Sequence, residues 1–186
     1  EVAESAGLIV ISDEIYERIL YGGTPHVPFA GLPGMGERTL TINGLSKTFS
    51  MTGWRIGYLA GPPALIQPLV RIHQNLVASA CSFVQWGAAE ALGGPGDCIA
   101  QMVAEYRIRR DLVWETLSAV SGVRLVRPEG AFYAFPGLSR PGLSAEELAH
   151  RLLEEAHVAV VPGGVFGPGG DGHVRLSFCC ATADVK

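Results

Sequence analysis

A lysine amine beside a predicted sheet edge is the first sign of chemistry in this sequence. The chain contains two lysines, Lys47 and Lys186, and Lys47 closely follows a predicted strand over residues 39–43. A lysine amine forms a Schiff base with a carbonyl compound when its surroundings activate it as a nucleophile. Taken alone, Lys47 also has a plainer interpretation as a surface lysine in a loop.

A carboxylate, Asp13, follows the continuous apolar run of residues 8–12. Such a run is typical of a strand buried on both faces, and ligands of open α/β sheets bind just beyond the carboxyl ends of the strands. We expect Asp13 to be buried and to meet a cation there, because an unpaired buried charge is costly to desolvate. The alternative is that Asp13 caps a short helix predicted over residues 14–20.

Two arginines are candidates for binding anions. Arg55 precedes a predicted strand over residues 56–60, and its guanidinium could bind a phosphate bidentately beside glycines that let a ligand approach. Arg175 lies in a predicted strand over residues 173–178, on the face opposite its apolar neighbours, and a planar guanidinium there suits a carboxylate. An ion pair with a core carboxylate is the alternative for Arg55, and a solvent-facing strand position is the alternative for Arg175.

Composition narrows the class of protein. The 186 residues carry 14 Lys and Arg against 18 Asp and Glu, and the net charge of −4 argues against nucleic-acid binding. Hydrophobic residues make up 48%, which excludes disorder as the main state. The 4 cysteines and 5 histidines lack the spacing of disulfide frameworks or metal sites. With neither a signal-peptide nor a membrane-anchor pattern, we expect a cytoplasmic protein without a metal or a membrane contact.

The first half of the chain predicts an α/β arrangement that would position these groups. Apolar runs predict the strands over residues 8–12, 39–43 and 56–60, joined by glycine- and proline-rich loops. Two prolines at 62 and 63 then open a predicted helix, and a second helical segment is predicted near residues 83–92.

The second half has an α+β pattern. After the break at residues 93–96, Asp97 is the predicted N-cap of a long amphipathic helix that extends to about residue 120. Strands are predicted over residues 123–125 and 131–135, joined by Pro128-Glu129-Gly130, and over 158–161. Between them, Ser144 and Glu147 form a predicted capping box. The glycine cluster places the domain boundary between residues 95 and 96, giving domains 1–95 and 96–186.

Taken in order, the motifs resemble one enzyme family. They are residues 13–16 (DEIY), 43–58 (NGLSKTFSMTGWRIGY), 128–133 (PEGAFY) and 174–178 (VRLSF). This pattern resembles the class I/II aminotransferases, which are fold type I enzymes that use pyridoxal 5′-phosphate (PLP), and within them the aspartate-aminotransferase-like branch. The resemblance covers nearly the whole chain, and its segment from 43 to 58 is the most specific.

The resemblance implies a role for each candidate. Lys47 would form the aldimine with PLP and later act as the base at the substrate Cα, giving a ping-pong transfer between an α-amino acid and a 2-oxo acid. Asp13 would pair with the protonated pyridine nitrogen, and Tyr16 would hydrogen-bond the 3′-oxygen. Arg55 would bind the PLP phosphate, and Arg175 would hold the substrate α-carboxylate.

The resemblance also implies a longer, homodimeric protein. The chain would be the C-terminal part of a major domain with a mostly parallel sheet and helices, plus an α+β small domain. We expect the 186-residue piece to be inactive alone and to fold poorly, because missing strands would leave apolar edges. One departure is Gly44, which stands where some relatives place a phosphate-binding serine.

Two other functions share these motifs. A PLP-dependent β-lyase would use the same lysine, aspartate and arginines. The aminotransferase-like sensor domain of a transcription regulator would add a DNA-binding domain upstream of this chain.

Overall fold

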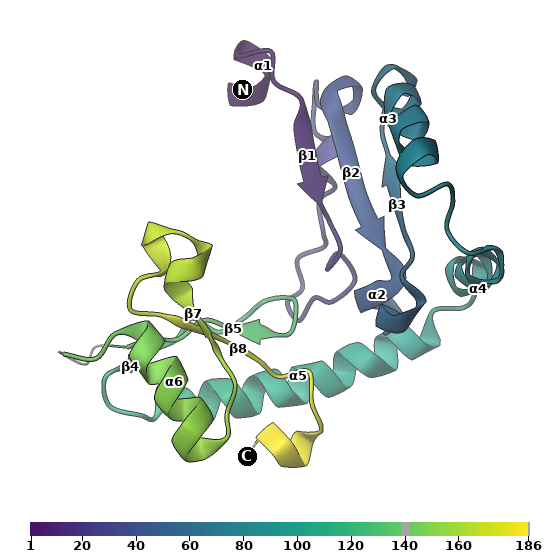
Figure 1. Ribbon diagram of the computed structural model, residues 1–186. Helices are drawn as coiled ribbons and strands as arrows, with labels where there is room; N and C mark the ends of the chain where they lie inside the picture. Colours follow the sequence, from purple (N-terminus) through teal and green to yellow (C-terminus); the bar gives the residue numbers. More distant parts are fainter. Residues whose placement is uncertain (139–141, 186) are drawn as a thin grey trace. The chain divides into compact units, whose positions relative to one another are not determined.

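The computed structural model describes residues 1–138 and 142–185 of the chain (Figure 1). The residues pack into two compact units, Glu1–Ala100 and Gln101–Lys186. The predicted domain boundary between residues 95 and 96 stays a prediction. In the described part of the chain, every helix is too short or too polar to cross a membrane.

The first unit is built on a three-stranded sheet with the order β1–β2–β3, whose bounds are Val10–Asp13, Thr39–Gly44 and Gly57–Ala60. β1 is parallel to β2, whereas β3 is antiparallel to it, so this sheet is mixed and not the mostly parallel one expected. The reason is the link between β2 and β3. It holds only α2 (Leu45–Thr48) and the 3₁₀ turn η3 (Thr52–Trp54), whereas a parallel crossover usually needs a longer helix.

Longer helices follow β3 in the sequence. α3 (Pro63–Leu76) begins at a proline, where the missing N–H has no helical partner to lose. α4 (Ser82–Gly93) confirms the helical segment predicted near residues 83–92, and α5 (Asp97–Ser118) confirms the long helix. Asp97 is the first residue of α5 and not the predicted N-cap. Short helical turns complete the unit: α1 (Val2–Ser5), η1 (Phe29–Gly31) and η2 (Gly36–Arg38).

The helix predicted over residues 14–20 is wrong, because this segment consists of turns. The backbone N–H of Glu14 donates to the carbonyl of Ile42 in β2 at 2.9 Å, which extends the ladder one residue beyond β1. The N–H of Glu17 then donates to the carbonyl of Glu14 at 3.0 Å and reverses the chain. The segment therefore continues the pairing with β2 at Glu14 and then turns, instead of beginning a helix.

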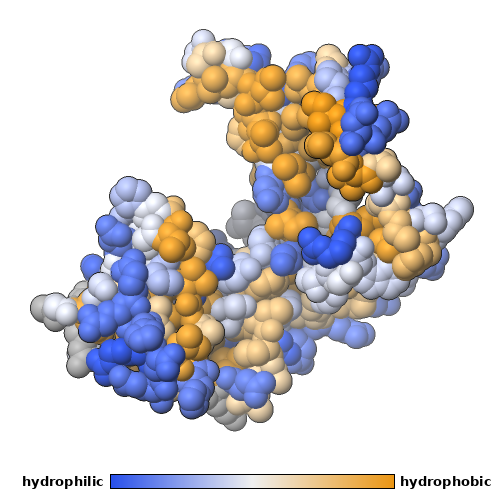
Figure 2. Space-filling model, viewed as in Figure 1, coloured by the Kyte–Doolittle hydropathy of each residue, from blue (hydrophilic) through white to orange (hydrophobic). Residues whose placement is uncertain are grey.

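The core of the first unit lies between β2, α2 and the neighbouring turns. Its buried apolar residues are Ile19, Tyr21, Met35, Leu40, Leu45, Val84, Ala88 and Ile99. The strand β1 is different, because it lies at the edge of the sheet and leaves Ile11 67% exposed. Figure 2 shows apolar residues gathered on the surface of this unit over its strands.

The second unit contains two small antiparallel sheets beside α5. β4 (Val123–Arg124) pairs with β6 (Gly137–Leu138), and β5 (Tyr133–Ala134) and β7 (Val161–Pro162) flank β8 (Val174–Ser177). The strands expected on either side of Pro128-Glu129-Gly130 therefore pair with other strands and not with each other. The predicted strand over 158–161 is reduced to β7, which begins at its last residue.

Capping and close packing define the rest of the second unit. The N–H of Glu147 donates to the Ser144 hydroxyl at 3.1 Å, which confirms Ser144 as the N-cap of α6 (Ala145–Ala156). A Cβ on Gly163 would collide with the carbonyl oxygen of Gly170, so only glycine fits this approach. The remaining 3₁₀ turns are η4 (Gly163–Phe166), η5 (Pro168–Gly170) and η6 (Thr182–Val185).

Candidate functional site

Three predicted site residues lie at one edge of the first unit's sheet, namely the edge formed by the carboxyl ends of β1 and β2. Because β1 and β2 are parallel, their carboxyl ends share this edge, with Asp13 opposite Ile42. Asp13 is the last residue of β1, and Lys47 follows the end of β2 by three residues. Tyr16 lies in the turn just after β1. The topology thus brings a carboxylate, a phenol and an amine to the position where ligands of α/β sheets bind.

The antiparallel strand β3 adds Arg55 to the same edge. Its first residue, Gly57, pairs with Gly44 at the end of β2. Arg55, two residues before β3, and Lys47, three residues after β2, therefore both lie at this end of the sheet. The backbone of Arg55 is left-handed, with φ 52° and ψ 49°, an uncommon conformation for a side-chain-bearing residue. Its guanidinium is exposed and donates to the carbonyl of Thr52 at 3.0 Å. No ion pair with Arg55 occurs in residues 1–138 and 142–185.

Asp13 is exposed in this chain, and the expectation that it is buried is wrong. Its carboxylate accepts a hydrogen bond from the Ile15 amide at 3.2 Å, a local turn that holds the side chain at the end of β1. Strand alternation directs Asp13 to the face opposite Ser12 and Glu14. Nothing in the described part of the first unit covers that face to the extent that burial would require.

A buried anchor holds the helix that carries Lys47. Leu45, at the start of α2, is 1% exposed, and the amide of Phe49 donates to its carbonyl at 3.1 Å. Thr48 is also buried, whereas Lys47 between them is half-buried. The helix is therefore fixed to the core through Leu45 and Thr48, with Lys47 half-buried between them.

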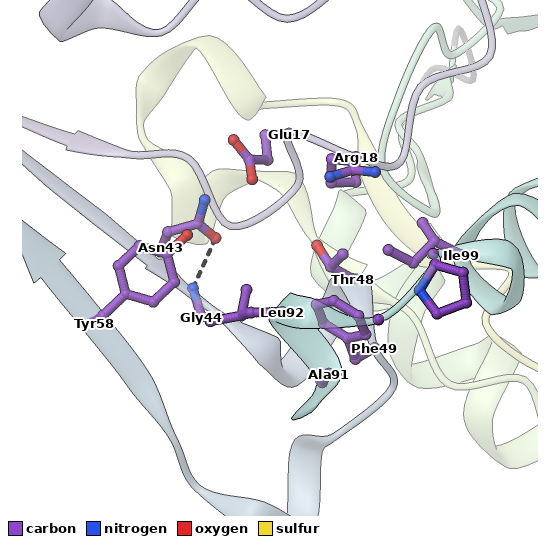
Figure 3. A pocket seen from close by; sticks show the side chains of 13 residues that line it. Glu17, Arg18, Asn43, Gly44, Thr48, Phe49, Tyr58, Ala91, Leu92 and Ile99 are labelled. Atoms are coloured by element: carbon purple, nitrogen blue, oxygen red, sulfur yellow. Dashed lines mark hydrogen bonds between the residues drawn. The ribbon is translucent and has the colours of Figure 1, made fainter. Parts of the chain in front are cut away.

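The structure explains the glycine at position 44. A Cβ there would lie 3.1 Å from both the Cα of Gly57 and the carbonyl oxygen of Ile56, and 3.3 Å from Ile15 Cδ1. The Gly44 amide is taken by the Asn43 side-chain oxygen at 2.7 Å, the dashed line in Figure 3. Close pairing of β2 with β3 therefore leaves little space for a side chain at position 44, and β3 would have to shift by a few tenths of an ångström to admit one.

A buried carboxylate that the sequence analysis missed supports this edge. Glu14 is 6% exposed and accepts hydrogen bonds from Ser12 Oγ at 3.0 Å, the Phe29 amide at 2.9 Å and His26 Nε2 at 2.8 Å. Burial opposes its ionisation, but these hydrogen bonds outweigh burial and lower the pKa of Glu14. Glu14, Glu17 and His26 have ligand-type atoms within 4.8 Å of one another. In the sequence, the alternation of Ser12 and Glu14 along the strand was the signal that both side chains lie on one face. The partner His26 could not be found in this way, because it lies twelve residues further along the chain.

A small pocket of about 120 Å³ lies next to these residues but includes none of the predicted ones (Figure 3). Glu17, Asn43 and Tyr58 lie on one side, and Thr48 and Ile99 on the other. Burial, and then the charges of Glu17 and Glu14, raise the pKa of Tyr58. The pocket is too small for a drug-sized ligand, which typically occupies about 300–1,000 Å³.

Arg175 belongs to the second unit, whereas the other four predicted residues belong to the first. It lies in β8 beside the buried Val174 and is itself half-buried. Its guanidinium carbon lies 4.6 Å from the ring centroid of Tyr133 and 4.7 Å from that of Phe166. Throughout the described ranges, no carboxylate forms an ion pair with Arg175. A half-buried cation of this kind can accept an anionic ligand.

Known proteins match the whole chain. Residues 1–186 match the family Aminotransferase class I and II. The aspartate aminotransferase of Pyrococcus abyssi is 44% identical over 186 residues, covering 97% of this chain and 48% of that protein. The aromatic-amino-acid aminotransferase 2 of Thermococcus litoralis is 42% identical, also covering 97% and 48%.

Solved structures give the same result. The aromatic aminotransferase from Pyrococcus horikoshii superposes with a TM-score of 0.94 at 42% identity, over 99% of this chain and 50% of that one. A Thermus thermophilus aspartate aminotransferase mutant gives 0.89 at 40%, over 99% and 50%. The chain therefore spans about half the length of the relatives that it matches.

Proposed function

Since this chain belongs to the aminotransferase class I and II family, we propose that it is part of a PLP-dependent aminotransferase. The enzyme would move an amino group between an α-amino acid and a 2-oxo acid by a ping-pong mechanism. The observation that carries this proposal is the convergence of Asp13, Lys47 and Arg55 at one sheet edge. Relatives that act as aspartate and aromatic aminotransferases at 42–44% identity support the reaction class.

The donor set at this edge fits PLP chemically. The cofactor has an aldehyde, a phosphate, a phenolic oxygen and a ring nitrogen, which suit an amine, a guanidinium, a phenol and a carboxylate in turn. Lys47, Arg55, Tyr16 and Asp13 supply these four groups. When bound, PLP supplies an electron sink that stabilises negative charge at the substrate Cα.

Each residue has a task that follows from its chemistry. The Lys47 amine would hold the cofactor and then move the proton at Cα, for which its half-buried position on an anchored helix is suited. Arg55 would bind the phosphate through charge-assisted hydrogen bonds, and its lack of an ion pair in the described residues leaves the charge available. The Asp13 carboxylate would keep the ring nitrogen protonated, because a nearby negative charge favours the protonated, positively charged form of the ring. This effect would be stronger where the bound cofactor and the rest of the protein shield Asp13 from water.

Arg175 would hold the α-carboxylate of the substrate. Fixing this group orients the Cα–H bond toward the Lys47 amine, which is a positioning effect on the rate. The half-buried guanidinium over two aromatic rings supports this assignment.

The rest of the proposal concerns the parent protein. Its three strands β1–β3 would belong to a larger, mostly parallel sheet, with residues 1–95 in the large domain and 96–186 in the small one. The relatives' twofold length and the exposed Ile11 on β1 support this extension. We also propose that the full-length protein is a cytoplasmic homodimer and that the 186-residue piece is inactive on its own.

A half-transamination screen of the full-length protein tests the proposal. Incubation with each amino acid should convert bound PLP to pyridoxamine phosphate and release a 2-oxo acid. Lys47→Ala should lose the visible absorbance of bound PLP and all turnover. Gln67 is exposed on α3, which follows the end of β3 away from Arg55. Gln67→Ala should therefore keep both the absorbance of bound PLP and the turnover.

Three outcomes contradict the proposal in different ways. Turnover that survives Lys47→Ala would remove the central assignment. Release of pyruvate and a thiol, without transfer to an oxo acid, would favour the β-lyase. PLP binding without either reaction, in a parent with an upstream DNA-binding domain, would favour the regulator.

A further inference from the structure

Two aromatic rings contact the guanidinium of Arg175, and neither has a part in the proposed reaction. We propose that Tyr133 and Phe166 are positioning residues that hold this guanidinium face-on and leave its N–H edge for the substrate α-carboxylate. The inference rests on the proposed role of Arg175.

The backbone fixes both rings near Arg175. Tyr133 in β5 pairs with Ser177 in β8, and Arg175 is two residues from Ser177, so both side chains lie on the same face of this sheet as diagonal neighbours. Their separation of 4.6 Å between guanidinium carbon and ring centroid is typical of a cation–π contact. The position of Tyr133 is thus set by the strand register.

Phe166 reaches Arg175 from a different element. It is the last residue of η4, which begins at Gly163, and the Gly163 amide donates to the carbonyl of His173 at 2.7 Å. The Phe135 ring meets that of Phe166 edge-on at 6.1 Å, and Phe135 stacks on His173 at 5.0 Å. Phe166 is therefore held by backbone and by ring contacts, although half of its surface is exposed.

An aromatic ring can hold an arginine without consuming its donors. A guanidinium has five N–H donors in its plane, while its flat face can stack on an aromatic ring. A protein carboxylate in the same position would bind the donors and compete with the substrate. In the described residues no carboxylate pairs with Arg175, and two rings contact it instead. This arrangement keeps the cation oriented, partly desolvated and unneutralised.

The test compares ring loss with ring retention in the full-length enzyme with PLP bound. Phe166→Leu and Tyr133→Leu should each raise KM for the best amino acid of the screen about three- to tenfold, with a smaller change in kcat. Phe166→Tyr and Tyr133→Phe keep a ring, so each should have the KM of the wild-type enzyme. Phe83→Leu, an exposed position on α4 in the first unit, is the matched control and should have no effect.

A second readout separates positioning from general damage. The amine that corresponds to the best substrate lacks the α-carboxylate, so its inhibition constant should stay unchanged in Phe166→Leu and Tyr133→Leu. An equal loss of binding for the amine and the amino acid would mean that the rings only support the structure, and would overturn the inference. A KM within twofold of wild type in both leucine variants would also overturn it.

Arg175→Leu distinguishes the two proposals. If it raises KM while the ring variants do not, the inference about the rings is wrong and the role of Arg175 stands. If Arg175→Leu leaves KM unchanged, the role of Arg175 is wrong, and the inference that rests on it is wrong as well.

Discussion

The carboxylate of Glu14 lies 2.8 Å from Nε2 of His26, a residue in the loop twelve positions further along the chain. Glu14 directly follows Asp13 but faces the other side of the strand. Through this contact and the one with the Phe29 amide, the buried carboxylate ties the loop to the end of β1. The position of Asp13 and of the turn after it therefore depends on Glu14, a residue without a part in the proposed reaction.

Replacing this carboxylate should destabilise the first unit. Glu14→Gln keeps the shape but loses the charge that accepts three hydrogen bonds, so we expect a loss of about 1–3 kcal/mol in the free energy of unfolding at pH 7. Because the pKa of Glu14 is lowered, its contribution is present above the ordinary value of 4.5 and is lost as the pH falls through the folded-state pKa. Unfolding of Glu14→Gln by urea should consequently depend less on pH below 4.5 than that of wild type. An equal pH dependence in both proteins would contradict this.

Restoring the serine that some relatives have at position 44 should fail. Gly44→Ser and Gly44→Ala place a Cβ against Gly57 and Ile56, and we expect each to cost about 1–3 kcal/mol of stability. Thermal unfolding measures the effect. Gly31→Ala is the control, because a Cβ there meets nothing within 4 Å. If Gly44→Ser is as stable as wild type, the close pairing of β2 with β3 is not what selects glycine.

Loss of an ion pair should destabilise the second unit. Asp111 forms ion pairs with Arg110 and Arg127 at 2.6 Å each; burial opposes its ionisation, but both arginines lower the pKa of Asp111. Asp111→Asn would leave the buried Arg110 charge without this partner, at a cost of roughly 2–3 kcal/mol, below the range for fully buried pairs. Glu155→Gln, in an exposed pair with Arg151, should leave the unfolding midpoint unchanged.

Removal of the Arg55 charge should weaken the binding of the phosphate end of PLP. Arg55→Gln should raise the dissociation constant of PLP roughly tenfold to a hundredfold, the range expected for lost charge-assisted hydrogen bonds. The affinity for pyridoxal, which has no phosphate, should stay the same and serves as the internal control. Equal losses for both ligands would assign Arg55 a structural role.

The edge strand β1 should make the isolated 186-residue chain prone to aggregate. It has an unpaired edge, and Ile11 is 67% exposed. Light scattering during refolding should decrease in Ile11→Lys, because a charge on an edge strand disfavours pairing with another chain. A monomeric wild-type chain at micromolar concentration would refute the prediction.

The segment around Lys47 and Arg55 could be predicted because its signals are local. The strand expected over 39–43 is β2, and the strand expected over 56–60 is β3, within one residue at their ends. The order of motifs also identified the family.

Long-range contacts could not be predicted. The hydrogen bond between Glu14 and His26 forms only when the loop returns to β1. The helix that the local pattern favoured is absent because Glu14 pairs with Ile42 of β2, a contact distant in sequence. Phe166 meets Arg175 because η4 brings it back to β8, a contact without periodicity in the sequence. The antiparallel direction of β3 depends on the short link after β2, which the strand pattern alone does not reveal.

The antiparallel return of β3 has a consequence for the order of folding. Lys47 and Arg55 are eight residues apart in a strand–turn–strand segment of low contact order, whereas Asp13 joins them only when β1 pairs with β2 across a 25-residue loop. Because local pairings form faster than distant ones, Lys47 and Arg55, the groups proposed for the aldehyde and the phosphate, should come together before Asp13, the group proposed for the ring nitrogen. During refolding, the proposed phosphate and aldehyde groups would thus assemble first, and the docking of β1 onto β2 would complete the proposed site.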